Sequence, residues 1–269
     1  EQDFPRDEYE ITAVDDGSAD DTRQSLKDFV AQHPSLNIKA IHFPRVIEKK
    51  SGDCRFRAGL ARNLGAKHST GKFLAFLDSD ILTPPNYLKR LKEEHKKADL
   101  ILLKRYHLKP KAPIEDLFSS HKNLKNFYYI EEQKYWGSFY KKGFDQVNCP
   151  WKYVCTYGLS LLKKDFEEIG AFGKNFVFYG FEDTDLGYRL FKQNKKFLLS
   201  DIKVYHQAPS DTERGNWNSF LLRQKQLSKT AKIFFYRHLE PEIYEELNIY
   251  MRQGRPLSYF SPFLKKSIF

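Results

Sequence analysis

Phe73-Leu74-Ala75-Phe76-Leu77-Asp78-Ser79-Asp80 is a run of five apolar residues that ends in two carboxylates one residue apart. A continuous apolar run of this length predicts a strand buried on both faces, as in a parallel sheet covered by helices. The carboxylates then lie at the carboxyl end of the strand, where open α/β sheets bind their ligands. This stretch predicts an α/β fold with a polar site at one edge of the sheet.

The segments on either side of this stretch continue the pattern. Apolar and β-rich runs alternate with segments whose apolar residues recur at helical spacing. Strand, helix, strand over the first hundred residues predicts an open, mostly parallel, Rossmann-like sheet flanked by helices. The predicted strands are 9–14, 37–43, 73–77 and 100–103, and the predicted helices are 22–31, 57–68 and 85–97.

The second half of the chain is less regular. Residues 104–157 are rich in aromatic residues and lysines, and we interpret them as loops and short helices that cover the sheet. Order returns with predicted strands at 158–162 and 197–205 and a helix that begins at Glu182. Residues 217–251 have a helical pattern, and a basic, aromatic tail follows from Arg252.

Composition narrows the possible partners. The chain has 45 Lys and Arg against 35 Asp and Glu, a formal charge of +10. Such a surface favours anionic partners such as nucleotide diphosphates, acidic glycans or anionic lipid, although a lysine-rich protein without a charged partner fits equally. We find no nucleic-acid recognition motif and therefore expect no nucleic-acid partner. The composition makes no prediction of oligomeric state.

The cysteines and the hydropathy bear on location. Three cysteines argue against a disulfide framework and fit a reducing compartment. No run approaches the roughly 18 to 20 apolar residues of a membrane span, and no secretory signal pattern opens the sequence. We expect a cytoplasmic protein, with contact at the inner face of a membrane through the basic tail left open.

Three acidic pairs and one histidine are candidates for chemistry. Asp78 and Asp80 could hold a divalent cation, and Asp15 and Asp16, which also end a strand, could accept hydrogen bonds from a nucleoside. His206 ends the strand at 197–205 and has the ring nitrogen of a metal ligand. Each pattern also has a structural interpretation, since Asp and Ser are common in turns and helix caps.

The third acidic pair, Glu182 and Asp183, opens a helix after the loop Phe178-Tyr179-Gly180-Phe181. Acidic residues in a first turn stabilise a helix by about 0.3–1 kcal/mol each through its dipole, which is the structural interpretation. The functional interpretation is a general base beside aromatic rings that stack on a sugar.

Together these motifs resemble glycosyltransferase family 2, which has the GT-A fold. The resemblance spans about residues 4–207, and its second half looks like the galactosyltransferase-type module of chondroitin-polymerase-like and polypeptide GalNAc-transferase-like enzymes. The motifs that carry it are Val14-Asp15-Asp16-Gly17-Ser18, Gly59-Leu60-Ala61-Arg62-Asn63, Phe76-Leu77-Asp78-Ser79-Asp80 and Gly180-Phe181-Glu182-Asp183-Thr184-Asp185-Leu186-Gly187.

The resemblance implies an inverting enzyme that moves a hexose or N-acetylhexosamine from a UDP-sugar to a hydroxyl of a glycan, glycolipid or glycoprotein. The residues implied for the donor are Asp15, Asp16, Arg62, Asp78 and Asp80, and those implied for Mn²⁺ or Mg²⁺ are Asp78, Asp80 and His206. Asp183 would be the general base, helped by Glu182, and the expected acceptor contacts are Trp151, Phe178, Tyr179 and Phe181.

The same resemblance predicts a domain organisation. Residues 1–103 would form the nucleotide-sugar half of one GT-A domain, 104–215 its acceptor and catalytic half, and 216–269 a helical appendage. Family members usually begin with an apolar strand and a Pro-Thr-Tyr-Asn-like loop. This sequence opens later in the pattern, at Gln2-Asp3-Phe4-Pro5, so we expect either a fragment of a longer domain or a sheet from which that strand is missing or in which it is supplied otherwise.

Two other interpretations remain at this point. A haloacid-dehalogenase-type phosphatase also has an apolar strand followed by Asp-x-Asp, with the first Asp as nucleophile. That interpretation leaves the other acidic pairs and His206 unexplained. The second alternative interpretation is a non-catalytic glycan-binding protein, or a partner protein of a polymerase, on a GT-A scaffold.

Overall fold

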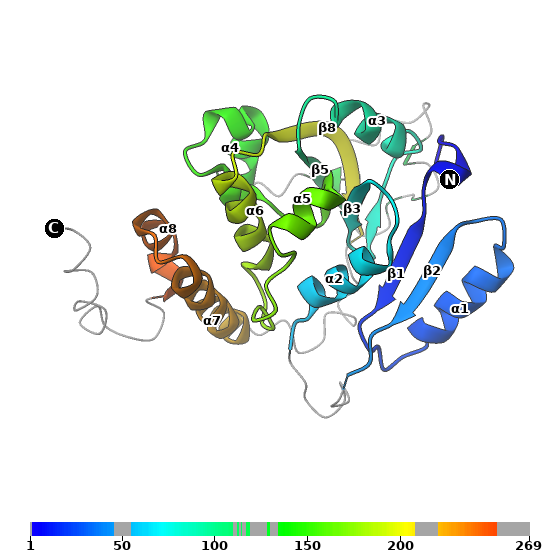
Figure 1. Ribbon diagram of the computed structural model, residues 1–269, viewed down its shortest axis with the longest axis horizontal. Helices are drawn as coiled ribbons and strands as arrows, with labels where there is room; N and C mark the ends of the chain where they lie inside the picture. The colour runs from blue at the N-terminus through cyan, green and yellow to red at the C-terminus, as the bar shows by residue number, and fades with distance from the viewer. Residues whose placement is uncertain are drawn as a thin grey trace.

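The computed structural model describes residues 2–45, 55–109, 112, 114, 117–118, 128–129, 134–207 and 220–251. Near its start, β1 (Ile11–Asp15) and β2 (Ile38–His42) lie side by side in parallel, with α1 (Thr22–Gln32) between them in sequence. Among the described residues these two strands form a sheet of their own (Figure 1).

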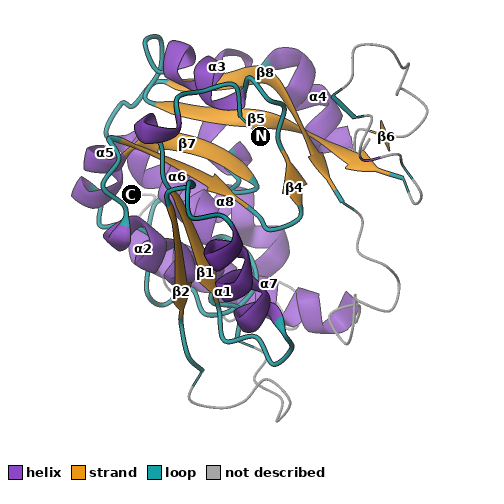
Figure 2. Ribbon diagram, turned by 90° about the vertical axis from the view of Figure 1, so that its right-hand side faces the viewer, coloured by secondary structure: helices purple, strands orange, loops and turns teal. Residues whose placement is uncertain are grey.

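A second, six-stranded sheet forms the centre of the molecule (Figure 2). β5 and β8 are parallel, whereas β7 lies between β3 and β5 and runs antiparallel to both, so β3, β5 and β8 share one direction. The two shortest strands, β4 and β6, are antiparallel to their neighbours. The strands are β3 (Phe73–Leu77), β7 (Gly158–Leu162), β5 (Leu100–Leu108), β8 (Phe197–His206), β4 (Ile81–Leu82) and β6 (Tyr128–Tyr129).

The helices surround the six-stranded sheet and share two apolar clusters. The larger cluster packs side chains of α2, α3 and α6 against the central strands, where Leu100, Ile101 and Leu102 are fully buried. The smaller cluster joins α6 to α7 and α8 through Tyr188 and Phe234. The helices are α2 (Ala58–His68), α3 (Tyr87–Glu94), α4 (Lys134–Lys142), α5 (Lys163–Glu168), α6 (Glu182–Lys192), α7 (Phe220–His238) and α8 (Pro241–Met251).

The predicted order of strands and helices is confirmed, with differences in extent. β5 continues five residues beyond the predicted end at residue 103, and α4 is a regular helix inside the segment interpreted as loops and short helices. The helical stretch from residue 217 is two helices, because Leu239 adopts a left-handed conformation (φ 53°) after α7 and Pro241 opens α8.

The prediction that β3 is buried on both faces is wrong. Leu74 and Phe76 are buried, but Phe73 and Leu77 on the opposite face are 36% and 38% exposed. β3 is the edge strand of the six-stranded sheet, and only one of its faces is covered by the described residues. A uniformly apolar run does not reveal which of its faces a neighbour covers.

α6 packs closely against the 3₁₀ turn Pro150–Tyr153 through Gly187. A Cβ atom at this glycine would lie 2.7 Å from Cβ of Val154 and 2.8 Å from the backbone oxygen of Trp151. The close approach therefore depends on the absence of a side chain at position 187.

We predict that Gly187→Ala destabilises the fold by about 1–3 kcal/mol because the added methyl group overpacks this contact. Urea unfolding followed by circular dichroism measures the change. Gly137→Ala is the matched control, since a Cβ at this glycine of α4 meets nothing within 4 Å. The control should be neutral or stabilise by up to about 1 kcal/mol through helix propensity. Equal effects of the two substitutions would contradict the packing argument.

Candidate active site

The strand ends that carry Asp80 and His206 meet because β4 pairs with β8. The register places Ile81 opposite His206, and the backbone N–H of Gln207 donates to the carbonyl oxygen of Asp80 at 2.8 Å. Nε2 of His206 lies 2.9 Å from Oδ2 of Asp80. Burial acts to raise the pKa of Asp80, but the hydrogen bond and charge of His206 outweigh it, and the pKa lies below its ordinary value.

Asp80 and His206 offer the ligand atoms that a hard divalent cation accepts, one carboxylate oxygen and one imidazole nitrogen. Two atoms 2.9 Å apart can share an octahedral ion whose bonds are about 2.1 Å long. Among the described residues, however, no three His, Cys, Asp or Glu side chains gather as a metal site. The predicted third ligand, Asp78, is instead paired with an arginine. The pair thus fits an ion of the Mg²⁺ or Mn²⁺ type whose remaining ligands are substrate oxygens or water.

Arg62 connects the strand-end carboxylates to the start of α6. Its Nη2 donates to Oδ1 of Asp78 at 2.7 Å, and its Nη1 lies 3.6 Å from Oε1 of Glu182. Gly59, one turn earlier in α2, allows this approach, because a Cβ there would lie 3.1 Å from Cβ of Phe172 and 3.6 Å from Cγ of Glu182. Two regions more than a hundred residues apart in sequence therefore share one guanidinium group.

Glu182, which is buried, and Asp183, which is half-buried, form an acidic pair at the first turn of α6. The preceding residues, Gly180 and Phe181, both have positive φ (91° and 66°), which turns the chain sharply into the helix. Burial raises the pKa of Glu182, and the neighbouring charge of Asp183 raises it further. Burial also raises the pKa of Asp183, against the opposing charge of Arg62 and backbone hydrogen bonds. Both carboxyl groups therefore bind a proton more tightly than they would in water.

A cavity of about 320 Å³ opens beside this acidic pair. Tyr179 and Phe181 line it, as predicted for acceptor contacts, and so do Trp136 and Leu227, which the sequence did not single out. No motif marks Trp136, since it is one aromatic residue among many in a lysine-rich segment. The full lining is Trp136, Cys155, Tyr179, Gly180, Phe181, Glu182, Asp183, Thr184 and Leu227.

Two of the predicted acceptor contacts lie elsewhere. Trp151 is 1% exposed, and its ring packs edge-on against Tyr188 and Phe234 in the smaller apolar cluster. The prediction of an acceptor contact for Trp151 is corrected by this burial, because no ligand reaches a fully covered ring. Phe178 is not among the residues that line the cavity; its ring lies under the ammonium group of Lys229, 4.4 Å from the ring centroid.

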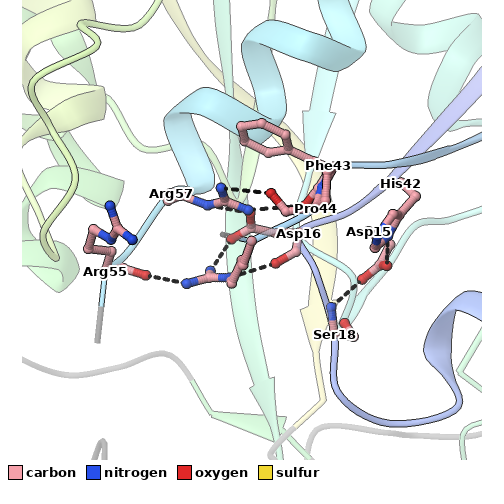
Figure 3. A network of polar contacts seen from close by, with 9 residues as sticks. Asp15, Asp16, Ser18, His42, Phe43, Pro44, Arg55 and Arg57 are labelled. Atoms are coloured by element: carbon pink, nitrogen blue, oxygen red, sulfur yellow. Dashed lines mark hydrogen bonds and ion pairs between the residues drawn. The ribbon is translucent and has the colours of Figure 1, made fainter. Parts of the chain in front are cut away.

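Asp16 is held by two arginines that come from a different part of the chain (Figure 3). Arg57 donates to Oδ1 from Nη2 at 2.6 Å and from Nε at 2.9 Å, and Arg45 forms an ion pair with Oδ2. Arg57 also lies over the ring of Phe43, 4.0 Å from its centroid. Two cations thus converge on one carboxylate, which leaves one positive charge in excess at the end of β1.

Asp15 has a different environment from its neighbour. It is 4% exposed, accepts the backbone N–H of Ser18 at 2.9 Å, and lies 2.8 Å from Nδ1 of His42. Burial acts to raise its pKa, but the hydrogen bonds from Ser18 and His42 outweigh it and lower the pKa (Figure 3). Asp15 therefore fastens the turn after β1 to β2, and Asp16 is the more accessible of the two predicted donor residues.

Comparison with known proteins assigns this arrangement to a family. Residues 1–170 match the model described as glycosyl transferase family 2. The chain belongs to glycosyl transferase family 2. This membership removes the phosphatase alternative.

The relatives of this chain include enzymes whose names indicate different substrates. Validoxylamine A glucosyltransferase of Streptomyces hygroscopicus subsp. jinggangensis is 28% identical over 232 residues, which cover 80% of this chain and 52% of that protein. Chondroitin synthase of Escherichia coli is 25% identical over 257 residues, 87% of this chain and 35% of that one. This chain therefore spans about half or less of these two relatives.

The crystal structure of TarS from Staphylococcus aureus has a similar fold. It superposes with a TM-score of 0.53 at 17% identity, over 97% of this chain and 41% of TarS. At that identity the likeness concerns the fold, and it confirms the predicted GT-A architecture. No helix within the described residues is long and apolar enough to cross a membrane. The basic tail from Arg252, for which membrane contact was left open, lies outside the described residues.

The raised pKa of Glu182 makes a prediction about stability. A carboxyl group whose pKa is higher in the folded protein than in the unfolded chain favours folding in its protonated form. Its contribution is therefore full below the unfolded pKa and is lost as pH rises toward the folded one. Each unit of elevation corresponds to about 1.4 kcal/mol.

We therefore expect Glu182→Gln, which keeps the shape of the protonated acid, to be more stable than the wild type at pH 8 and equal to it near pH 4. Urea unfolding at both pH values measures the difference. Glu245→Gln, at an exposed position of α8, should show no such pH-dependent gain. A Glu182→Gln variant less stable than the wild type at pH 8 would count against the burial argument.

Proposed function

We propose that this chain is an inverting glycosyltransferase that moves a hexose or N-acetylhexosamine from a UDP-sugar to a hydroxyl of a glycan or glycoconjugate. The observation that carries the proposal is the acidic pair Glu182–Asp183, which faces an aromatic cavity on one side and Arg62 on the other. The names of the relatives, a glucosyltransferase and a chondroitin synthase, support sugars of this class.

In this proposal Asp183 is the general base. It borders the cavity where an acceptor hydroxyl would enter, and its raised pKa suits a group that must take a proton. The acceptor oxygen forms a bond to the anomeric carbon while Asp183 receives the hydroxyl proton. The bond from that carbon to the diphosphate oxygen breaks, and its electron pair leaves with the diphosphate. A single displacement of this kind inverts the anomeric centre.

The donor would lie across the ends of β1 and β3. Asp16, with Asp15 behind it, would meet the nucleoside, and the excess positive charge of Arg45 and Arg57 favours an anionic ligand there. Arg62 would lie near the diphosphate, and Asp78 would accept a ribose hydroxyl. Asp80 and His206 would hold Mn²⁺ or Mg²⁺, which supplies charge neutralisation for the departing diphosphate.

The test of the base is Asp183→Asn, which keeps size and hydrogen bonding but cannot accept the proton. We expect transfer to fall by at least about 10²-fold, the usual contribution of a positioned base, while UDP binding stays within about twofold. Release of UDP from a panel of UDP-sugars with Mn²⁺ and glycan acceptors measures transfer, and calorimetry measures UDP binding. Near-normal turnover of Asp183→Asn would refute the assignment.

The test of the cation site is Asp80→Ala. We expect the variant to lose the Mn²⁺-dependent part of UDP affinity, because His206 alone is a weak site for a hard cation. Titrations of UDP with and without Mn²⁺ measure this difference, and Asp99→Ala, remote from the site just before β5, is the control.

A wild type that binds glycans yet neither hydrolyses nor transfers from any UDP-sugar would instead support a non-catalytic scaffold.

A further inference from the structure

Helix α7 holds the loop that lines the cavity. Oε1 of Gln226 accepts the backbone N–H of Tyr179 at 3.0 Å, and Oγ1 of Thr230 donates to the carbonyl oxygen of Tyr179 at 3.1 Å. Both side chains are buried, with 2% and 0% of their surface exposed. One residue of the cavity wall is therefore bonded through both of its backbone polar groups to α7.

Leu227 lies between these two contacts and is itself part of the cavity lining. Its Cδ2 lies 2.5 Å from the position that a Cβ of Gly180 would occupy. Gly180 has φ 91°, so a side chain at this position would be both strained and in collision with Leu227. The loop and the helix thus fit each other at the point where the cavity is formed.

The far end of α7 is bonded to the catalytic helix. Asp185, two residues after Asp183, is fully buried, and its Oδ1 lies 2.8 Å from Nε2 of His238. Its Oδ2 accepts hydrogen bonds from Arg237 at 3.2 Å and from Arg189 at 2.7 Å. α7 is consequently attached at its middle and at its carboxyl end to the segment 179–189 that carries the acidic pair, and Figure 1 shows α7 close to α6.

The chemistry of the cavity indicates what it would accept. Trp136, Tyr179, Phe181 and Leu227 give it apolar and aromatic surface, and the carboxylates of Glu182 and Asp183 form its polar side. A pyranose ring has the matching parts, an apolar face of C–H groups and hydroxyls at its edge. Oε2 of Glu182 is buried and has no hydrogen-bond partner within the described structure.

We propose that α7 is a wall of the acceptor site and that Leu227 determines which acceptor sugar fits. Gln226 and Thr230 are positioning residues that act through Tyr179. This inference deepens the proposed glycosyltransferase function and rests on it. It also changes the predicted role of residues 220–238 from an appendage to a component of the site.

The experiment compares Leu227→Ala, Leu227→Met and Lys225→Ala. Leu227→Ala enlarges the cavity, Leu227→Met preserves its volume and serves as the conservative variant, and Lys225 is exposed on the same helix. The probes are p-nitrophenyl glycosides of glucose, galactose, N-acetylglucosamine and N-acetylgalactosamine. Saturation-transfer NMR measures the binding of these glycosides. The acceptor KM and kcat are measured with the UDP-sugar that the wild type uses. UDP release without acceptor measures the donor reaction.

We expect Leu227→Ala to change the acceptor KM at least about tenfold and to alter the ranking of the glycosides, whereas Lys225→Ala should leave UDP release unchanged within about twofold. Leu227→Met and Lys225→Ala should keep the wild-type ranking. Gln226→Met, which cannot accept the Tyr179 N–H, should raise the acceptor KM.

An unchanged ranking and KM in a folded Leu227→Ala protein would overturn the inference, as would a wild type that binds none of the glycosides. Absence of UDP release and transfer in a wild type that binds glycosides would refute the proposed function instead. In that case the NMR binding profiles of the same variants still decide whether Leu227 determines the bound sugar.

Discussion

The placement of two adjacent carboxylates at the start of α6, one buried and one half-buried, is the constraint that the rest of the site accommodates. Removing a charged group from water is costly unless partners compensate for the lost hydration. Arg62 and backbone N–H groups at the first turn offset part of the lost hydration of Glu182 and Asp183. Because the compensation is incomplete, the pKa of each carboxyl group is raised. Gly180 and Phe181, which have positive φ, turn the chain into α6, and Gly59 leaves room for α2 to approach Glu182.

Arg62 is the element that unites the two halves of the site. The same guanidinium meets Asp78, at the end of a strand, and Glu182, at the start of a helix. Any change at the donor-side carboxylate therefore alters the electrostatic field at the acid pair. One charged group also serves two partners at the end of β1, where Asp16 pairs with both Arg45 and Arg57, while Asp15 fastens the turn.

Much of the fold could be predicted from the sequence, because continuous apolar runs and helical spacing are local signals. The antiparallel direction of β7 could not, since Gly158–Leu162 has the same apolar composition as a parallel strand. The exposed face of β3 was missed for a related reason, as burial depends on neighbours that the strand itself does not encode.

The residues of the candidate site also differ in how far the sequence could predict them. The acidic pairs and His206 lie at or next to the ends of elements that were predictable, and the structure brings Asp80 to His206 and Arg62 to Asp78 and Glu182. The aromatic residues were less predictable. Trp151 and Trp136 are alike in sequence context, yet the first is covered by Phe234 and the second lines the cavity. Only long-range packing separates their roles.

The bonds between Asp185 and the end of α7 also set an order of assembly during synthesis. Residues 182–192 leave the ribosome well before Arg237 and His238, so Asp185 initially lacks two of its three partners. A buried carboxylate without its partners is unfavourable, and α6 gains its final environment only when α7 docks. The segment that carries the acidic pair therefore reaches its final packing only after residues 237 and 238 have been synthesised.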